Sequence, residues 1–485
     1  MTAWLWWLSC VPEWASFSQA TGRVAATQNH YLRRLFASNR NCGYFQAHRL
    51  KSWRDFRQQL PLISYADLKP WIEERPSQLC SEPIRLFEPT SGTQSVKLIP
   101  YTASLKREFQ RGLCAWIADL YGGKPQLMRG RAYWAITPPP QRQQHLHGIP
   151  VGFEDDAAYL TGWGEKLVRR MLAVPRACGL DQTLEHLLRC PELSLVSVWS
   201  PSYWLLLLER LRQNWGYFAS LPGLGAPLAR ARSQGLRALW PRLQLLSCWA
   251  DGPSRRFLPE LRADFPDLFI QPKGLLATEA FVTFPLLGRA GGALALRSHF
   301  FEFLSGQRSY LAHELCQGQL YEVVVSTGGG LYRYRLGDQV RVQGFVRECP
   351  LLSFVGRVGL VSDHYGEKLS PEAIDPWLPG QPGPCFVAFE KGGYVLYASD
   401  PLQPQLLAQG ERHLCSYYHY RLCRELGQLQ PLRGYRLSSE SWEPFYARLE
   451  RAGRRRGEVK VASLRLEEDW SLHLPGQWVP APAKL

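Results

Sequence analysis

The stretch "YEVVVSTGGGLYRYRLGDQVRVQGF", Tyr321 to Phe345, alternates Val, Tyr and Arg on either side of a glycine triplet. Alternation with a period of two is typical of strands, because successive side chains point to opposite faces of a sheet. The triplet Gly328-Gly329-Gly330 suits a chain reversal. We therefore predict two or three strands here, with the reversal at the triplet.

Segments before this stretch predict helices as well as strands. Residues 102–121, "TASLKREFQRGLCAWIADLY", place their apolar side chains on one helical face, with Thr102 or Ser104 as the N-cap. Residues 202–215, "SYWLLLLERLRQNW", indicate a buried helix. Residues 243–252, "LQLLSCWADG", indicate a buried strand that ends in a turn. This mixture predicts an α/β protein.

The C-terminal third predicts a second, smaller unit. Residues 385–399, "CFVAFEKGGYVLYAS", suit a hairpin, and helices are expected near 411–427 and 441–453, with another begun near Ser370-Pro371. We predict a large N-terminal α/β adenylating domain, residues 1–356, with β-sheets flanked by helices. A smaller, mobile α+β lid domain would follow, residues 357–485.

Composition indicates a globular protein and leaves the meaning of its charge open. The 485 residues are 45% hydrophobic and 20% charged, with a formal charge of +15. Such a charge can attract nucleic acid, an anionic membrane or anionic small molecules. It can also be a feature of the composition alone, since arginine outnumbers lysine throughout the chain. The one basic cluster is "RAGRRRGEVK", residues 451–460, and no nucleic-acid motif accompanies it. We expect no specific nucleic-acid partner.

Cysteine spacing and the N-terminus bear on the compartment. The 12 cysteines form no CxxC pair, which argues against a disulfide framework or a zinc site and favours reduced thiols in a cytoplasm. The opening "MTAWLWWLSCVPEWASF" lacks a basic n-region, so we interpret it as a packed helix rather than a signal sequence. No later segment has the apolar length of a membrane span.

One loop has the chemistry of a phosphate site. In "FEPTSGTQSVKLIPYT", Phe87 to Thr102, the hydroxyl and glycine residues Thr90-Ser91-Gly92-Thr93 precede Lys97. Hydroxyls and free N–H groups in a glycine-containing turn make a concave set of donors for phosphate oxygens, and a lysine adds a mobile charge. The same residues also suit a plain Ser/Thr turn.

Three further motifs follow along the chain, and each also has a structural interpretation. Thr278-Glu279 lies between apolar runs, where a carboxylate suits Mg²⁺ beside phosphates but also a helix start. Asp338 follows Gly337 at a strand end, suiting ribose hydroxyls or an ordinary turn. Arg357 and Lys368 lie near the expected domain boundary. They suit a loop that gates a nucleotide between the two domains, but they also suit a solvated linker.

The order of these motifs resembles the acyl-adenylate-forming superfamily. In finer detail, segments such as "EPTSGTQSVKLIPYT", "GLLATEAFVTFPL" and "FVGRVGLVSDHYGEKLS" resemble the bacterial branch of the auxin-responsive promoter family of acyl-acid amido synthetases. The resemblance covers most of the chain. It implies that a carboxylic acid is adenylated with Mg-ATP and that the acyl group then passes to an amino acid, giving an amide and AMP.

The resemblance also implies roles for individual residues. Thr278 would touch the α-phosphate, Glu279 would hold Mg²⁺ and Asp338 would bind the ribose. Lys460 matches the family's C-terminal lysine that approaches the adenylate. The remaining nucleotide-binding residues would be Ser91, Gly92, Thr93 and Lys97 in the phosphate loop, and Arg357 and Lys368 at the hinge.

Other features are left open. Trp199, Ser202 and Tyr203 are candidates for the acyl pocket, although core packing also suits them. The loop lacks the second glycine usual in the superfamily, so a degenerate, non-catalytic member is an alternative, as is a ligase that forms acyl-CoA thioesters. The acid, the amine and the oligomeric state are not readable from the sequence.

Overall fold

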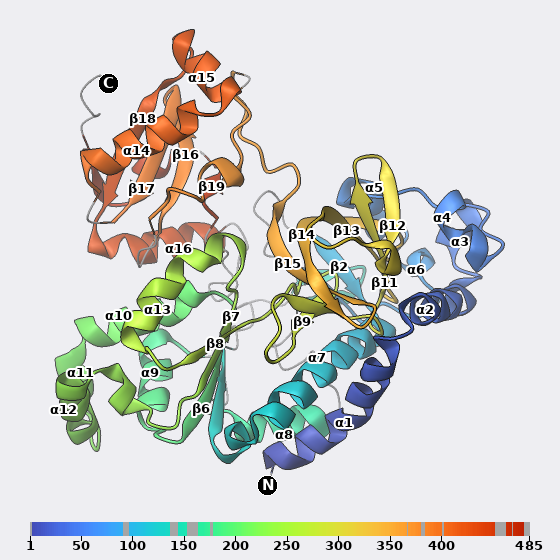
Figure 1. Cartoon of the computed structure of the whole chain (residues 1–485), viewed down its shortest axis with the longest axis horizontal. Helices are drawn as coiled ribbons and strands as arrows, with labels where there is room; N and C mark the ends of the chain where they lie inside the picture. The colour runs from blue at the N-terminus through green and yellow to red at the C-terminus, as the bar shows by residue number, and fades with distance from the viewer. Residues whose placement is uncertain are drawn as a thin grey trace.

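The computed structural model describes residues 2–90, 97–135, 144–152, 163–174, 178–365, 367–379, 384–399, 402–451, 462–467 and 469–479. Figure 1 shows a mixed α/β molecule in which several sheets are flanked by helices, with the C-terminal sheet set apart at one end. This is the predicted fold class. No helix in these ranges is both long and apolar enough to cross a membrane.

The largest sheet has seven strands, all antiparallel to their neighbours. In spatial order these are β12 (Arg308–Leu311), β11 (Phe300–Ser305), β13 (Leu320–Ser326), β14 (Tyr334–Val346), β15 (Cys349–Arg357), β10 (Gly292–Leu294) and β9 (Thr283–Pro285). The predicted strands of Tyr321 to Phe345 are β13 and β14, and the glycine triplet lies between them, which confirms that prediction. The triplet fits a crowded place, because a Cβ on Gly329 would lie 2.7 Å from the Pro100 carbonyl oxygen.

A second sheet is parallel, and its central strands are buried. Its four strands are β3 (Arg131–Trp134), β6 (Leu193–Ser197), β7 (Leu245–Cys248) and β8 (Phe269–Pro272). Helices α9 (Leu180–Leu188), α10 (Pro201–Gln213), α12 (Gly225–Gln234) and α13 (Leu258–Asp264) share a core with it, beside the short α11 (Trp215–Ser220). Strands β6 and β7 are buried throughout, as expected of a parallel sheet covered by helices. The predicted strand and helix are therefore confirmed as β7 and α10.

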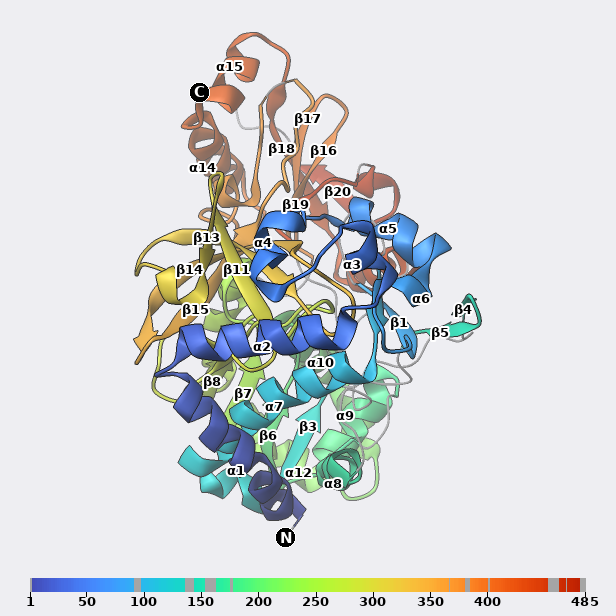
Figure 2. The same ribbon diagram turned by 90° about the vertical axis from the view of Figure 1, so that its right-hand side faces the viewer.

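The N-terminal helices pack against the antiparallel sheet. Helices α1 (Thr2–Ala20), α2 (Val24–Asn39) and α7 (Ala103–Gly123) contribute to one core with its strands, and Figure 2 shows the three together on one side. The N-cap of α7 is Thr102, whose hydroxyl accepts a hydrogen bond from Leu105 N. The predicted packed N-terminal helix is confirmed as α1. The other nearby helices are α3 (Gly43–Ala47), α4 (Phe56–Gln59), α5 (Tyr65–Glu74), α6 (Pro76–Leu79) and α8 (Trp163–Met171).

A small third sheet carries the predicted phosphate loop. It runs β2 (Leu98–Tyr101), β1 (Leu86–Pro89), β5 (Ile149–Val151) and β4 (Gln144–Leu146). Strands β1 and β2 are antiparallel, with Pro89 opposite Leu98. The predicted loop thus connects two strands that pair with each other.

The C-terminal sheet is covered on both faces. Its order is β19 (Leu464–Arg465), β16 (Phe386–Glu390), β17 (Gly393–Ala398), β18 (Gln430–Leu437) and β20 (Gly476–Val479). Val387 and Leu396 pack in one cluster with α14 (Pro404–Cys415) and α15 (Tyr418–Glu425). Phe386 and Val395 pack on the opposite face with α16 (Trp442–Arg451) and with Leu206 of α10. This face therefore also contacts the parallel-sheet region.

Some local predictions in this region were wrong. The helix expected over 411–427 is two helices, α14 and α15, with Ser416 and Tyr417 between them. The helix expected after Ser370 is a single 3₁₀ turn, Pro371–Ala373. The expected domain boundary, between residues 356 and 357, lies at the end of β15, whose last residue is Arg357, and the division into two domains stays a prediction. All 12 cysteines are free thiols.

Candidate functional site

A cavity of about 280 Å³ opens at the carboxyl edge of the parallel sheet. Its wall includes Trp134, Ser197, Trp249 and Lys273, each at or just beyond the end of one of the four parallel strands. Ligands of open α/β sheets bind at this edge, because the loops after the strands converge there. Asp338 and Arg357, from β14 and β15, form the wall opposite.

The loop that carries Thr278 and Glu279 is held from several sides. Leu276 and Phe281 form an isolated bridge across it, and the Tyr101 hydroxyl donates a hydrogen bond of 2.6 Å to the Thr278 carbonyl oxygen. At its entrance, Gly274 has φ +77°, and a Cβ there would lie 2.7 Å from the Thr283 carbonyl oxygen. Both Thr278 and Glu279 line the cavity, and the Glu279 side chain is buried.

A buried histidine supports the same loop from behind. The Phe281 backbone N donates to His299 Nε2 at 3.0 Å, so Nε2 is unprotonated and the ring proton is on Nδ1. His299 Nδ1 lies 3.1 Å from Glu108 Oε2 and donates to it. Glu108 also accepts from the Tyr31 hydroxyl at 2.6 Å and from Gly328 N at 3.0 Å. This network joins the Thr278-Glu279 loop to the glycine triplet.

Polar and charged residues from distant parts of the chain meet at one end of the cavity. We call this the polar end, and its residues are Thr90, Lys97, Thr278, Glu279, Asp338 and Arg357. Lys97 Nζ donates to the Tyr334 hydroxyl at 3.3 Å. Burial lowers the pKa of Lys97, while Glu279 raises it. Burial and, to a smaller extent, the negative charge of Glu279 raise the pKa of Tyr334. The Glu279 carboxylate is thus near enough to influence both groups.

Asp338 and Arg357 form an ion pair within the polar end. They lie opposite each other in the β14–β15 register, and Arg357 Nε is 2.8 Å from Asp338 Oδ1. Asp338 raises the pKa of Arg357, with burial opposing it and Glu279 adding to the increase. The sequence predicted both residues but assigned them separate tasks. Extending the hairpin register would have revealed the pair.

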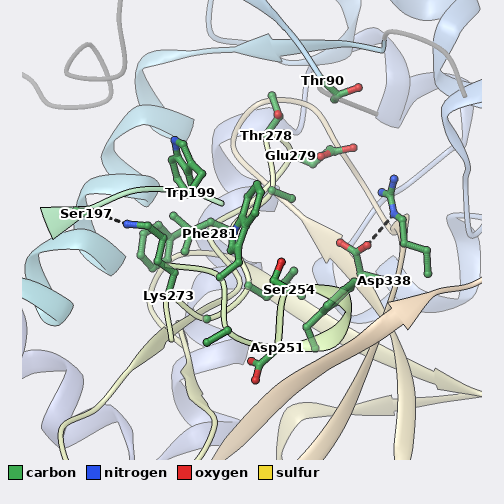
Figure 3. Close-up of a pocket in the computed structure, with 18 of the residues that line it drawn as sticks. Thr90, Ser197, Trp199, Asp251, Ser254, Lys273, Thr278, Glu279, Phe281 and Asp338 are labelled. Carbon is green, nitrogen blue, oxygen red and sulfur yellow. Dashed lines mark hydrogen bonds and ion pairs between the residues drawn. The ribbon is translucent and has the colours of Figure 1, made fainter. Parts of the chain in front are cut away.

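The other end of the cavity is aromatic. We call it the aromatic end, and Figure 3 shows Trp199 and Lys273 on one side of Phe281, with Thr278, Glu279 and Asp338 on the other. Its residues are Phe109, Leu113, Trp116, Trp134, Trp199, Trp249, Lys273 and Phe281. Of the acyl-pocket candidates, Trp199 lines the cavity. Ser202 and Tyr203 lie in α10, where Ser202 is buried 2.6 Å from Ser200 Oγ and Tyr203 OH is 3.4 Å from Tyr133 OH.

Of the remaining predicted residues, some lie outside the described residues, one lies on the cavity wall and one lies away from it. Ser91, Gly92, Thr93 and Lys460 lie outside the described residues. Thr90 and Lys97, which flank the first segment, hydrogen-bond each other through Thr90 N and the Lys97 carbonyl oxygen at 2.8 Å. Ala462 and Ser463, which follow Lys460 closely, line the cavity. Lys368 is exposed, with φ +47°, and is not part of the cavity wall.

The sequence missed Lys273 and most of the aromatic end. Apart from Phe281, these residues come from β3, α7 and the ends of β6, β7 and β8, so they share no motif. The available signal was a lysine directly after a strand in "LFIQPKGLL", where apolar residues surround it. Indoles scattered through the chain gave no sign that four of them gather at one cavity.

Comparison with known proteins identifies the family. The model of the GH3 family N-terminal domain matches residues 14–220, and that of the GH3 family central domain matches residues 292–357. The chain belongs to the GH3 family, which confirms the family expected from the motifs. Its assignment to a bacterial branch stays a prediction.

Named relatives share much of the chain's length at low identity. A rice (Oryza sativa subsp. japonica) protein that carries the name indole-3-acetic acid-amido synthetase GH3.10 is 25% identical over 404 residues, covering 72% of this chain and 82% of its own. Indole-3-acetic acid-amido synthetase GH3.3 of Arabidopsis thaliana is 22% identical, covering 78% and 77%. The solved GH3.15 acyl acid amido synthetase superposes with a TM-score of 0.81 at 18% identity, covering 97% of this chain and 98% of that one, which shows the fold.

Proposed function

We propose that this protein is an ATP-dependent acyl-acid amido synthetase, a ligase that forms C–N bonds. A carboxylate oxygen of the acid attacks the α-phosphorus of ATP and displaces pyrophosphate, giving an acyl-adenylate. The amine of an amino acid then attacks the acyl carbon, a proton leaves the nitrogen, and AMP departs. The amide and AMP are the products.

One observation carries the proposal: a single cavity has a polar end and an aromatic end. The polar end offers carboxylates, hydroxyls and cations around one point, as a nucleotide with its metal requires. The aromatic end offers flat apolar walls, which suit the body of a hydrophobic acid. Membership of the GH3 family, with relatives named as amido synthetases, supports the same reaction.

The residues of the polar end fit ATP with Mg²⁺. Glu279 is a buried carboxylate on the cavity wall, and one carboxylate beside substrate phosphates is a common way to hold this cation. No cluster of three or more potential ligand side chains occurs in the described parts of the chain, so the phosphates and water would complete the shell. Bound Mg²⁺ would neutralise charge on the phosphate oxygens.

The proposed tasks of the other residues follow from their positions. Thr278 would donate to the α-phosphate and Asp338, held by Arg357, would accept from the ribose hydroxyls. Lys97, with Ser91, Gly92 and Thr93, would bind the outer phosphates. Lys368 would meet the nucleotide only after a movement, since its side chain is exposed here.

We also propose that residues 357–485 act as a lid on residues 1–356. An acyl-adenylate must be kept from water, and closure of a small domain does this. Ala462 and Ser463, which follow Lys460 in the sequence, lie on the cavity wall, and this supports the proposal. Lys460 would stabilise negative charge that develops during adenylation.

The test is ATP–pyrophosphate exchange with a panel of aromatic and aliphatic carboxylic acids, followed by an amino-acid panel on each active acid. We expect acid-dependent exchange and, with the right amine, an amide and AMP. If none of the acids supports exchange, the protein is a non-catalytic family member. Transfer to coenzyme A in place of every amino acid would identify a thioester-forming ligase.

A further inference from the structure

Lys273 is a buried cation in the aromatic end of the cavity. It directly follows β8, lines the cavity and is 7% exposed. Figure 3 shows its ammonium directed toward Ser197. The proposed adenylation assigns it no task, because the nucleotide residues lie at the other end.

Two indoles and one hydroxyl lie around the ammonium. Lys273 Nζ donates to Ser197 Oγ at 2.6 Å and lies 5.3 Å and 5.1 Å from the ring centroids of Trp116 and Trp199. Such distances allow attraction between a cation and an indole face. The Trp116 ring is itself held, since its Nε1 donates to Gln271 Oε1 at 3.1 Å. The lysine is therefore presented in one defined place.

Lys273 is a charged side chain among aromatic ones on the cavity wall. A lysine on the wall of an otherwise aromatic pocket resembles the few polar groups that orient a ligand in a mostly apolar site. The observation thus points to a ligand atom that accepts a hydrogen bond.

The geometry indicates which part of the ligand this is. Phe281 lies between Lys273 and the loop that carries Thr278 and Glu279 (Figure 3). The carboxyl group that reacts must meet the α-phosphate near Thr278. The body of the acid would then extend along Phe281 and the indoles, and its far end would approach Lys273.

We propose that Lys273 is a specificity-determining residue that selects aromatic carboxylic acids bearing an oxygen acceptor at the end remote from the reacting carboxyl group. This inference rests on the proposed function for the direction in which the acid lies. The acceptor can be a hydroxyl, a carbonyl or a second carboxylate, and Lys273 and Ser197 together would bind it.

The test compares acids that differ only in that remote group. Pairs of 4-hydroxy and 4-methyl derivatives of benzoic, phenylacetic and cinnamic acid have nearly equal size. Their affinities are measured with ATP present by quenching of tryptophan fluorescence, since Trp116 and Trp199 flank the site, and kcat/KM is measured by pyrophosphate exchange. Wild type should favour the hydroxy acid of at least one pair by about tenfold to hundredfold, the range of a hydrogen bond to a charged group.

Lys273→Met should reduce that preference to about one, and Lys273→Gln, which keeps a neutral donor, should give an intermediate ratio. The matched control is Lys124→Met, because Lys124 lies 5.0 Å from the Phe269 ring outside the cavity wall and its loss should leave the ratio unchanged. If Lys273→Met does not fold, Lys273→Gln carries the measurement.

Two outcomes would overturn the inference: a wild type that shows no preference for the hydroxy acids, or a preference that survives in both Lys273 variants. Failure of the proposed function looks different. In that case no acid supports exchange, while the fluorescence titrations still report whether binding of the hydroxy acids depends on Lys273.

Discussion

The two ends of the cavity differ in how the chain builds them. The polar end comes from short motifs in loops and at strand ends, where a few adjacent residues such as Thr278-Glu279 act together. Apart from Phe281, which follows Thr278-Glu279 in the same loop, the aromatic end comes from residues at the ends of four parallel strands and on one helix, far apart in the sequence. Chemistry common to a family can reside in such motifs, whereas the shape that selects one acid is distributed over the fold.

The largest effect is expected from Glu279→Gln, which changes the polar end alone. The amide keeps the shape but loses the charge that a hard divalent cation needs. Adenylation should fall by roughly a thousandfold or more, because charge stabilisation at the phosphates is lost. Pyrophosphate exchange at several Mg²⁺ concentrations measures this. Glu74→Gln, at an exposed glutamate, is the control, and wild-type exchange in Glu279→Gln would make Glu279 a structural residue.

Lys460→Ala should have the next largest effect. The variant should fold and bind ATP normally but form the adenylate roughly 10²–10³-fold more slowly, the usual cost of losing one preorganised donor at developing charge. Single-turnover measurements of adenylate formation, with the exposed Lys69→Ala as control, test this. Equal rates in wild type and variant would place Lys460 on a solvated surface.

Asp338→Asn should weaken ATP binding by about tenfold to hundredfold, through loss of charged hydrogen bonds to the ribose. Asp338 also neutralises Arg357, so some of the effect can come from the broken ion pair. Calorimetry on Asp338→Asn, Arg357→Gln and the double variant separates the two contributions. If ATP affinity is unchanged in Asp338→Asn, the carboxylate has no part in nucleotide binding.

The smallest of these effects should come from His299→Ala, since His299 supports the Thr278-Glu279 loop from behind, through a hydrogen bond from the Phe281 N–H. We expect a roughly tenfold loss of kcat, comparable to the loss of other outer-shell partners. His299→Gln, which can both accept and donate, should restore much of it. A variant that loses stability without this pattern of rescue would show a purely structural role.

The sequence predicted the fold class and most elements because their patterns are local. The hairpin of β13 and β14, the cap of α7 at Thr102 and the strand β7 all follow from spacing within a few residues. The split of 411–427 into α14 and α15 was missed, since the break at Ser416 contains neither proline nor glycine. Five predicted polar residues, Lys97, Thr278, Glu279, Asp338 and Arg357, do lie around one cavity.

What could not be predicted depends on contacts between distant elements. Nothing local shows that Lys273 meets Ser197 and Trp116, because β6, α7 and β8 come together only in the folded protein. For the same reason Trp199 was proposed together with Ser202 and Tyr203, although the turn into α10 directs Trp199 to the cavity and buries Ser202 elsewhere.

The most direct test of a two-ended cavity is one exchange experiment on two variants, Asp338→Asn and Lys273→Met, with both ATP and the paired acids titrated. The account predicts that Asp338→Asn raises the KM for ATP and leaves the preference between hydroxy and methyl acids unchanged. It predicts that Lys273→Met changes that preference and leaves the KM for ATP unchanged. If each variant instead altered both quantities to the same extent, the cavity would not be divided into a nucleotide end and an acyl end.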